Sequence, residues 1–389
     1  MIVGVLKEPI SGEKRVAATP ESVKQLIGEG LTVTIQKGSG SLAGYPDDEY
    51  KAAGATIAAT VDPAKLDVLL HVRPLAPATI KKLKKGAITM GLGSPASEAA
   101  AVKALRDQKV TSFALELVPR ISRAQSMDAL TSQALIAGYR CVIEASTRFP
   151  RFFPLYMTAA GTVPPAKVLV LGAGVAGLQA IATAKRLGAK VSAYDVRSAS
   201  ADEVRSMGGT FVELDMGESA DGAGGYAKEL AADRVKRQQE LLTPYVSAAD
   251  IIITTAAIPG RPAPQLITAA MMKDMKPGSV IIDLAAETGG NVEGSEPGVD
   301  TMVSVGKSGG LVTLVGMKDV PSTMAFDASR LYAKNVSNLL TLMTKDNTVV
   351  PDFEDEVVAG ACLTHDGEIR HEPTAQAMAA PAKEKKGGK

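Results

Sequence analysis

Short apolar runs alternate with longer helix-like stretches along most of the chain. Runs of this kind are typical of buried parallel strands, and the amphipathic stretches between them are typical of helices. Strands are predicted at 2–6, 32–36, 68–72, 88–90, 111–114, 168–171, 191–194, 210–214, 251–255, 279–284 and 311–316. Helices are predicted at 21–28, 47–53, 80–85, 97–107, 175–187 and 321–343. The alternation predicts an α/β protein with two doubly wound domains.

A glycine pattern lies between the strand at 168–171 and the helix that follows it. Gly172, Gly174 and Gly177 form a G-x-G-x-x-G motif. The first glycine permits a tight turn, the second lets a pyrophosphate approach the backbone, and the third lets the helix pack closely on the strand. The helix N-terminus then presents N–H groups to phosphates. In this context the motif predicts a dinucleotide-binding turn, with packing glycines alone as the alternative.

Asp195 ends the next predicted strand, eighteen residues beyond Gly177. Its carboxylate can accept hydrogen bonds from both hydroxyls of an adenosine ribose, and it would repel a 2′-phosphate. This favours NAD(H) over NADP(H). Arg197 favours NADP(H) to some extent, because an arginine just past the strand can hold a 2′-phosphate.

Composition excludes several other classes. The chain has 43 Lys and Arg against 42 Asp and Glu, with no tryptophan and no basic stripe, so nucleic acid is not an expected partner. Cys141 and Cys362 stand far apart without metal-ligand spacing, which predicts no metal site and a cytoplasmic location. No secretory signal is present, and the apolar run 168–184 is too short and too rich in turn glycines to span a membrane.

A second glycine cluster follows the strand at 32–36. Gly38, Gly40 and Gly44 have the last glycine one residue late, and Tyr45-Pro46 prevents an apolar helix from starting there. We interpret this cluster as a plain loop, so the first domain lacks its own nucleotide fingerprint. The fingerprint at 172–177 instead assigns nucleotide binding to a second domain. We predict a Rossmann NAD-binding domain at 133–317, inserted into a discontinuous first domain at 1–132 plus 318–389. We expect NAD in the cleft and a flexible tail from about residue 375.

A polar segment follows the strand at 111–114, at the sheet edge where open α/β folds bind ligands. Arg120, Gln125 and Asp128 fall within nine residues and could hold one another and a planar carboxamide. A solvated loop anchored by Ile121, Ala124 and Met127 is the alternative.

With this segment and the glycine motif together, the chain resembles the NAD(H)-binding alpha subunit of proton-translocating nicotinamide nucleotide transhydrogenase, over roughly residues 1–371. The most specific match is the string Arg-Ile-Ser-Arg-Ala-Gln-Ser-Met-Asp at 120–128. Further matches lie at 12–20, 158–166, 172–180, 224–229 and 275–284.

The resemblance implies roles for individual residues. Arg120, Gln125 and Asp128 would act at the nicotinamide, with Thr131 beside them where a serine is common. The remaining nucleotide contacts would come from Ala173, Gly174 and Val175 along the pyrophosphate, Asp195, Val196 and Arg197 around the ribose, and Gly225, Tyr226, Gln238 and Ala257. Glycines at 222, 224 and 225 beside Tyr226 independently suggest a mobile lid over the nucleotide.

Alanine dehydrogenase is a related alternative that needs a cation for a substrate carboxylate and a proton-transfer group. Arg15 could supply the cation. His71 stands in place of the substrate lysine, the catalytic histidine is missing from 87–93, and Glu287 replaces the catalytic aspartate. The machinery for oxidising an amino acid is therefore incomplete, and His71 is expected to be a packed strand residue.

Hydride transfer between two nicotinamides needs no proton transfer in the hydride step, so positioning can supply most of the catalysis. The resemblance implies a proton-translocating, Si-face to Re-face specific transhydrogenase, with NADP(H) on a partner subunit. It also implies a homodimer docked peripherally on the inner face of the membrane through a membrane-bound beta subunit. Any small membrane-spanning alpha piece is expected on a separate chain, because this one ends at Lys389. A non-enzymatic NAD(H)-sensing module is the alternative from another class.

Overall fold

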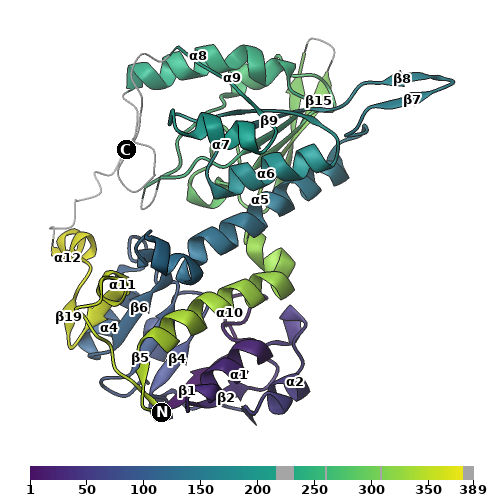
Figure 1. Cartoon of the computed structure of the whole chain (residues 1–389). Coiled ribbons are helices and arrows are strands. Elements are labelled where there is room, and N and C mark those ends of the chain that lie inside the picture. The colour runs from purple at the N-terminus through teal and green to yellow at the C-terminus, as the bar shows by residue number, and fades with distance from the viewer. Residues whose placement is uncertain (216–231, 259–260, 307–308, 380–389) are drawn as a thin grey trace. The chain divides into compact units, whose positions relative to one another are not determined.

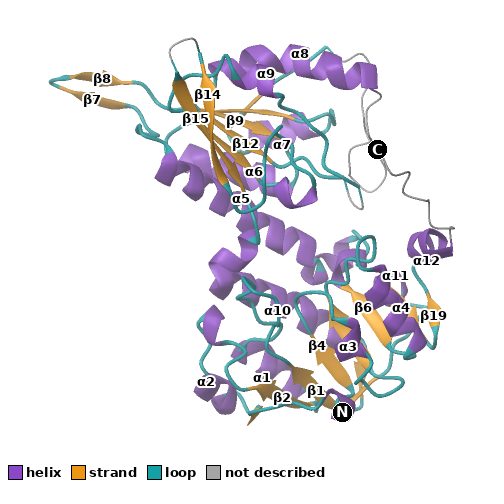
Figure 2. Cartoon of the chain, turned by 180° about the vertical axis from the view of Figure 1, so that it is seen from behind, coloured by secondary structure: helices purple, strands orange, loops and turns teal. Residues whose placement is uncertain are grey.

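The computed structural model describes residues 1–215, 232–258, 261–306 and 309–379. The chain divides into two compact units. Unit 1 comprises Met1–Gln133 and Pro321–Lys389, and unit 2 comprises Ala134–Val320. Each unit is an α/β body built on its own sheet, as the sequence predicts (Figures 1 and 2).

The sheet of unit 1 has the strand order β19-β18-β6-β5-β4-β1-β2-β3. Its strands are β1 (Ile2–Val5), β2 (Thr32–Gln36), β3 (Thr56–Ala58), β4 (Val68–Leu70), β5 (Ile88–Gly91), β6 (Thr111–Ala114), β18 (Cys362–His365) and β19 (Glu368–Ile369). The first six are parallel, while β18 pairs antiparallel with both β6 and β19. Because the chain runs outward in both directions from β1 and β4, the topological switch point of this sheet lies between those two strands.

Helices cover both faces of this sheet. They are α1 (Pro20–Gly28), α2 (Asp47–Ala52), α3 (Pro77–Ile80), α4 (Ala99–Asp107), α10 (Ala325–Leu342), α11 (Glu356–Ala361) and α12 (Glu372–Ala379), with a small hairpin of β16 (Thr344–Lys345) and β17 (Thr348–Val349). Val68 and Leu70 of β4 join one apolar core and Leu69 joins the other. Burial on both faces explains why these strands appear in the sequence as unbroken apolar runs.

The sheet of unit 2 has the order β11-β10-β9-β12-β13-β15-β14, with only β14 antiparallel to its neighbour. Its strands are β9 (Lys167–Leu171), β10 (Lys190–Tyr194), β11 (Thr210–Phe211), β12 (Ile251–Thr254), β13 (Val280–Asp283), β14 (Asp300–Val305) and β15 (Gly310–Gly316). Its helices are α5 (Ala129–Arg148), which begins in unit 1, α6 (Val175–Arg186), α7 (Ser200–Ser206), α8 (Ala232–Ala248) and α9 (Ala269–Met272). A separate hairpin of β7 (Tyr156–Thr158) and β8 (Gly161–Val163) projects from the body of this unit (Figure 1).

Some predicted elements are wrong. The helix expected at 80–85 is α3, which starts at Pro77 and ends at Ile80, because the lysines at 81, 82, 84 and 85 repel one another in a helix. The tail expected from residue 375 begins inside α12, and residues 380–389 lie outside the described residues of the chain. The polar segment ends where α5 begins, at Ala129.

The second glycine cluster is a loop, as predicted. A short 3-10 turn, Ser41–Ala43, lies between Gly40 and Gly44, and no apolar helix starts at the cluster. A Cβ atom on Gly40 would lie 2.5 Å from the Tyr50 hydroxyl, so this glycine is needed for packing.

Candidate functional site

The turn between β9 and α6 gives each motif glycine a different environment. Gly172 has φ of 98°, and a Cβ atom there would lie 2.7 Å from Thr255 Oγ1. A Cβ atom on Gly177 would collide with the Gly172 carbonyl. Around Gly174, by contrast, such an atom would meet nothing within 4 Å. The outer glycines are therefore required by the protein itself, while the middle one leaves open space at the mouth of the turn.

The same turn leaves the N-terminus of α6 available to an anion. Gly174 is the N-cap residue, and no side chain caps the helix. The amides of the first turn, including that of Val175, therefore keep their capacity to donate. Ala173 is fully buried beside them and fixes the turn against the core. This arrangement fits a pyrophosphate, which needs backbone donors and the absence of a side chain.

Asp195 is held by the turn itself. Its carboxylate accepts from the backbone N–H of Ala173 over 2.7 Å, and from the backbone N–H of Arg197 over 2.9 Å. The Arg197 guanidinium lies on the same carboxylate, with Nε 2.9 Å from Oδ1 and Nη2 2.9 Å from Oδ2. The Asp195 carboxylate therefore connects the glycine turn to Arg197 and neutralises the charge of that arginine.

Other residues predicted to contact the nucleotide differ in how deeply they are buried. Gln238 is buried and donates from Nε2 to the Tyr194 hydroxyl over 3.1 Å, so it supports the last residue of β10, directly before Asp195. Val196 packs partly buried against the apolar core, while Ala257 is exposed just after β12. Gly225 and Tyr226, including the proposed lid, lie outside the described residues.

In unit 1 the polar segment forms a 3-10 turn, Ser122–Met127, directly before α5. Ala124 and Met127 are buried in the core, while Arg120 and Gln125 are exposed. Asp128 accepts from the Thr131 backbone N–H over 2.9 Å and from its hydroxyl over 2.6 Å. Two expected nicotinamide contacts, Asp128 and Thr131, are therefore bonded to each other at the start of α5.

The carboxyl edge of the unit 1 sheet carries a buried ionic network that sequence reasoning missed. Glu13 accepts from Arg15 Nη2 over 2.7 Å and from Arg73 Nε over 2.7 Å. Arg15 also donates to Gln133 Oε1 over 2.9 Å, and the Ser322 hydroxyl donates to Glu13 over 3.1 Å. Although burial opposes ionisation, the Arg15 and Arg73 guanidinium groups lower the pKa of Glu13 to about 2. The network joins Gln133, the last residue of unit 1 before the chain leaves it, to Ser322, just after the chain returns.

This network bears on the alanine dehydrogenase alternative. Arg15, the residue suited to a substrate carboxylate, is 4% exposed and already paired with the chain's own Glu13. His71 is 6% exposed, its Nδ1 lies 2.8 Å from the Arg73 carbonyl oxygen, and burial lowers its pKa to about 4. His71 is therefore packed, as predicted, but it lies directly after β4, which ends at Leu70. Glu287 is exposed and accepts from the Asp319 backbone N–H over 2.9 Å.

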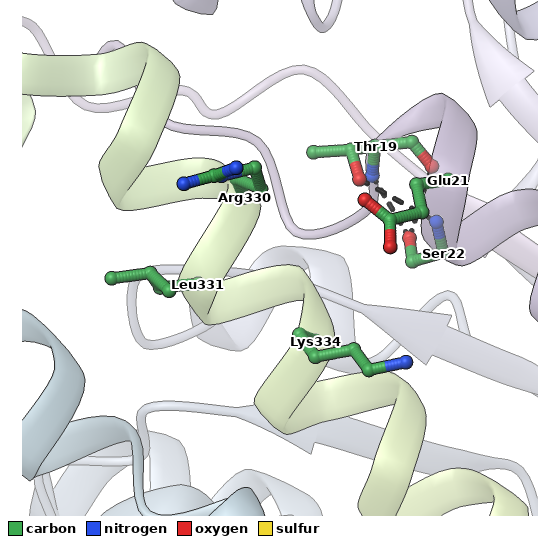
Figure 3. Close-up of a pocket in the computed structure, with 6 residues that line it drawn as sticks. All are labelled: Thr19, Glu21, Ser22, Arg330, Leu331 and Lys334. Carbon is green, nitrogen blue, oxygen red and sulfur yellow. Dashed lines mark hydrogen bonds between the residues drawn. The ribbon is translucent and has the colours of Figure 1, made fainter.

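A surface hollow on unit 1 lies apart from all of these residues (Figure 3). It is lined by Thr19, Glu21, Ser22, Arg330, Leu331 and Lys334. Thr19 and Ser22 bond each other as the capping box of α1, and Lys334 donates to Gln25 over 2.9 Å. None of the lining residues belongs to the predicted site, and we interpret the hollow as a groove between the packed helices α1 and α10.

Within the described ranges, no cluster of three or more His, Cys, Asp or Glu side chains could hold a metal ion. Among those same residues, none of the helices has the length and apolar character needed to cross a membrane.

The fold and the turn together define a two-unit α/β protein with one dinucleotide-binding fingerprint. The description "Alanine dehydrogenase/PNT, C-terminal domain" matches residues 141–372, and "Alanine dehydrogenase/PNT, N-terminal domain" matches residues 4–137. The chain belongs to this alanine dehydrogenase/PNT family and, within it, to the transhydrogenase alpha subunits.

Individual relatives support this placement. The chain is 50% identical to the first portion of NAD(P) transhydrogenase subunit alpha from Rhodospirillum rubrum, over 95% of this chain and 98% of that one. It is 33% identical to alanine dehydrogenase of Bacillus subtilis, over 75% and 72% of the two chains. A crystal structure of transhydrogenase from Sinorhizobium meliloti superposes with a TM-score of 0.82 at 43% identity, covering 96% of this chain and all of that one. A solved L-alanine dehydrogenase, 24% identical with a TM-score of 0.79, shares the fold.

Proposed function

We propose that this chain is the NAD(H)-binding subunit of a proton-translocating transhydrogenase. It would transfer hydride directly between NADH and NADP⁺ held on a partner subunit, giving NAD⁺ and NADPH. The observation that carries the proposal is the open space at Gly174, beside an uncapped helix N-terminus and a carboxylate tied to the same turn. The names of the relatives support the same activity.

Different residues would bind the different parts of the nucleotide. The amides of Gly174 and Val175 would hold the pyrophosphate, with Ala173 alongside it and its own N–H bonded to Asp195. Asp195 and Arg197 would lie at the adenosine ribose. Arg120, Gln125 and Asp128 would orient the nicotinamide. The nicotinamide supplies the hydride, so the protein's contribution is to hold the ring and exclude other acceptors. The finer assignments, Si-face to Re-face transfer and peripheral docking on a membrane-bound beta subunit, rest on resemblance to the family.

Gly174→Ala tests the binding site without disturbing the fold. Gly174 has φ of −75°, which any residue adopts, and a Cβ atom there would meet no protein atom. We expect unchanged thermal stability and at least about tenfold weaker NADH binding by calorimetry, because the methyl group fills the space a pyrophosphate needs. Gly28→Ala is the matched control, since a Cβ atom at Gly28 also meets nothing within 4 Å but lies in α1. Unchanged NADH affinity in Gly174→Ala would contradict the proposed site.

The homodimer is also a proposal, supported by the β7–β8 hairpin. Phe152, Leu155, Tyr156 and Met157 are 57%, 51%, 46% and 76% exposed. Apolar side chains gathered on a projecting arm favour association with a second copy. Replacing Met157 and Leu155 by glutamate should shift the chain from dimer to monomer in light scattering, and a monomeric unaltered chain would rule this out.

The alternative activity is oxidation of alanine. The paired state of Arg15 and the absence of the catalytic histidine from 87–93 weigh against it. A non-enzymatic NAD(H)-sensing module would bind the nucleotide but exchange no hydride with an NADP(H)-loaded partner.

A further inference from the structure

Gln125 occupies an unusual place in its turn. Its neighbours Ala124 and Met127 are 1% and 8% exposed, and both belong to the core that also contains Val357 and Val358 of α11. Gln125 itself is exposed. The backbone is therefore anchored on both sides of a side chain that points away from the core.

Two distant segments hold this turn in addition to the core. On one side, Arg123 Nη1 and Nη2 lie 2.9 and 2.7 Å from the two carboxylate oxygens of Asp355. This is a bidentate pair, which fixes orientation as well as distance. Asp355 is itself fixed, because it caps α11 by accepting from the Val357 and Val358 backbone N–H groups.

On the other side, α10 holds the backbone directly after Gln125. Asn335 Nδ2 donates to the Ser126 carbonyl over 2.9 Å, and Asn338 Nδ2 donates to the same oxygen over 3.2 Å. Asn335 is only 7% exposed, and its own Oδ1 accepts from the Ser132 hydroxyl over 2.7 Å. One amide therefore ties the turn to the first residues of α5.

We propose that Asp355 and Asn335 are positioning residues, which hold the 122–127 turn so that Gln125 is presented in one fixed orientation for hydride transfer. The proposal rests on the proposed function, since it assigns Gln125 to the nicotinamide end of that site. A side chain that must reach a second nucleotide gains from such preorganisation, because a displacement of about 1 Å can cost on the order of 10²-fold in rate.

Asp355→Asn separates positioning from folding. Asparagine caps a helix as well as aspartate, so α11 should persist while the ionic part of the pair with Arg123 is lost. We expect backbone amides of residues 122–128 to exchange hydrogen about threefold faster. Hydride transfer at saturating nucleotides should fall by a similar factor, with NADH affinity changed less than about twofold. The double variant Arg123→Gln with Asp355→Asn should fall no further than either single variant, because each breaks the same pair.

Asn335→Asp is the stronger perturbation, because it removes a buried donor and places a carboxylate beside the Ser126 carbonyl. We expect about tenfold slower transfer and faster exchange in the same segment. Asp107→Asn is the matched control for Asp355→Asn, since Asp107 is also paired with an arginine, Arg106, but lies in α4. It should change neither readout.

The outcomes distinguish the two proposals. Unchanged hydrogen exchange at 122–128 in both variants would overturn the positioning role. Faster exchange with unchanged transfer would overturn it as well, and the variant Gln125→Asn then decides the rest. If Gln125→Asn slows transfer, the proposed function stands without this support; if it does not, the turn has no part in hydride transfer.

Discussion

The backbone N–H of Ala173 donates to the carboxylate of Asp195 over 2.7 Å, so the acid directly after β10 is bonded to the middle of the glycine turn directly after β9. The two strands are parallel neighbours, and Tyr194 of one lies opposite Leu171 of the other. In the proposed site, selection of the nucleotide and the shape of the glycine turn therefore depend on the same carboxylate.

Asp195→Ala should narrow the preference for NADH over NADPH. The substitution removes an acceptor for the ribose hydroxyls and the repulsion of a 2′-phosphate, and it releases Arg197, which is now paired with the carboxylate. NADH should bind at least about tenfold more weakly and NADPH should bind more tightly, as measured by calorimetry. Equal affinities for NADH and NADPH in the unaltered chain would contradict the proposed role of Asp195 in selecting the nucleotide.

Gln125→Asn and Arg120→Ala should separate transfer from binding. Asparagine is one methylene shorter, so NADH affinity should change little while hydride transfer falls by up to about 10²-fold. Arg120→Ala should weaken both, because it removes the proposed carboxamide clamp. Stopped-flow transfer rates set beside NADH titrations distinguish the two, and an unchanged rate in Gln125→Asn would show the turn to be structural.

Most of the fold could be predicted because its central strands are buried on both faces and appear as unbroken apolar runs. The missed strands β3, β14, β18 and β19 lie at or near sheet edges, where short length and partial exposure leave little pattern. The turn residues at 172–177 and Asp195 could be predicted because one local motif carries them. The partners of the 122–127 turn could not, since Asp355 lies more than two hundred residues from Arg123 and no local pattern connects them.

Glu13→Gln should destabilise unit 1 strongly. The Glu13 side chain is fully buried and neutralises Arg15 and Arg73, so removing its charge leaves a buried guanidinium uncompensated. A loss of about 3–5 kcal/mol in the free energy of unfolding is expected from denaturant titration. Since folding lowers the pKa of Glu13 to about 2 from 4.5, its stabilisation is complete above about pH 4.5 and fades as the pH falls toward 2. In Glu13→Gln, the part of the loss of stability at low pH that comes from protonation of Glu13 should be absent. An unfolding free energy equal to that of the unaltered chain would mean that the ion pairs of Glu13 contribute nothing to stability.

The contribution of Glu8 to stability should depend on pH in the opposite direction to that of Glu13. Burial raises its pKa to about 7 from 4.5, against the opposing hydrogen bonds from the Val72 and Arg73 backbone N–H groups. The folded state therefore binds the proton more tightly than the unfolded state, and this residue costs stability as the pH rises from about 4.5 to 7. Glu8→Gln should remove that decline, which amounts to about 3 kcal/mol at 1.36 kcal/mol per pKa unit. Chemical denaturation of both proteins between pH 5 and 8 provides the check, and parallel pH profiles would exclude this effect.

Hydride exchange in a reconstituted complex tests the central claim most directly. The purified chain is mixed with an NADP(H)-binding transhydrogenase partner, and transfer from NADH to NADP⁺ is followed with deuterium at C4 of the NADH nicotinamide. We expect the label to appear in NADPH only when both proteins are present, and we expect Gly174→Ala to suppress the transfer at low NADH. No transfer with the unaltered chain at saturating NADH, or robust oxidation of alanine by this chain alone, would contradict that claim.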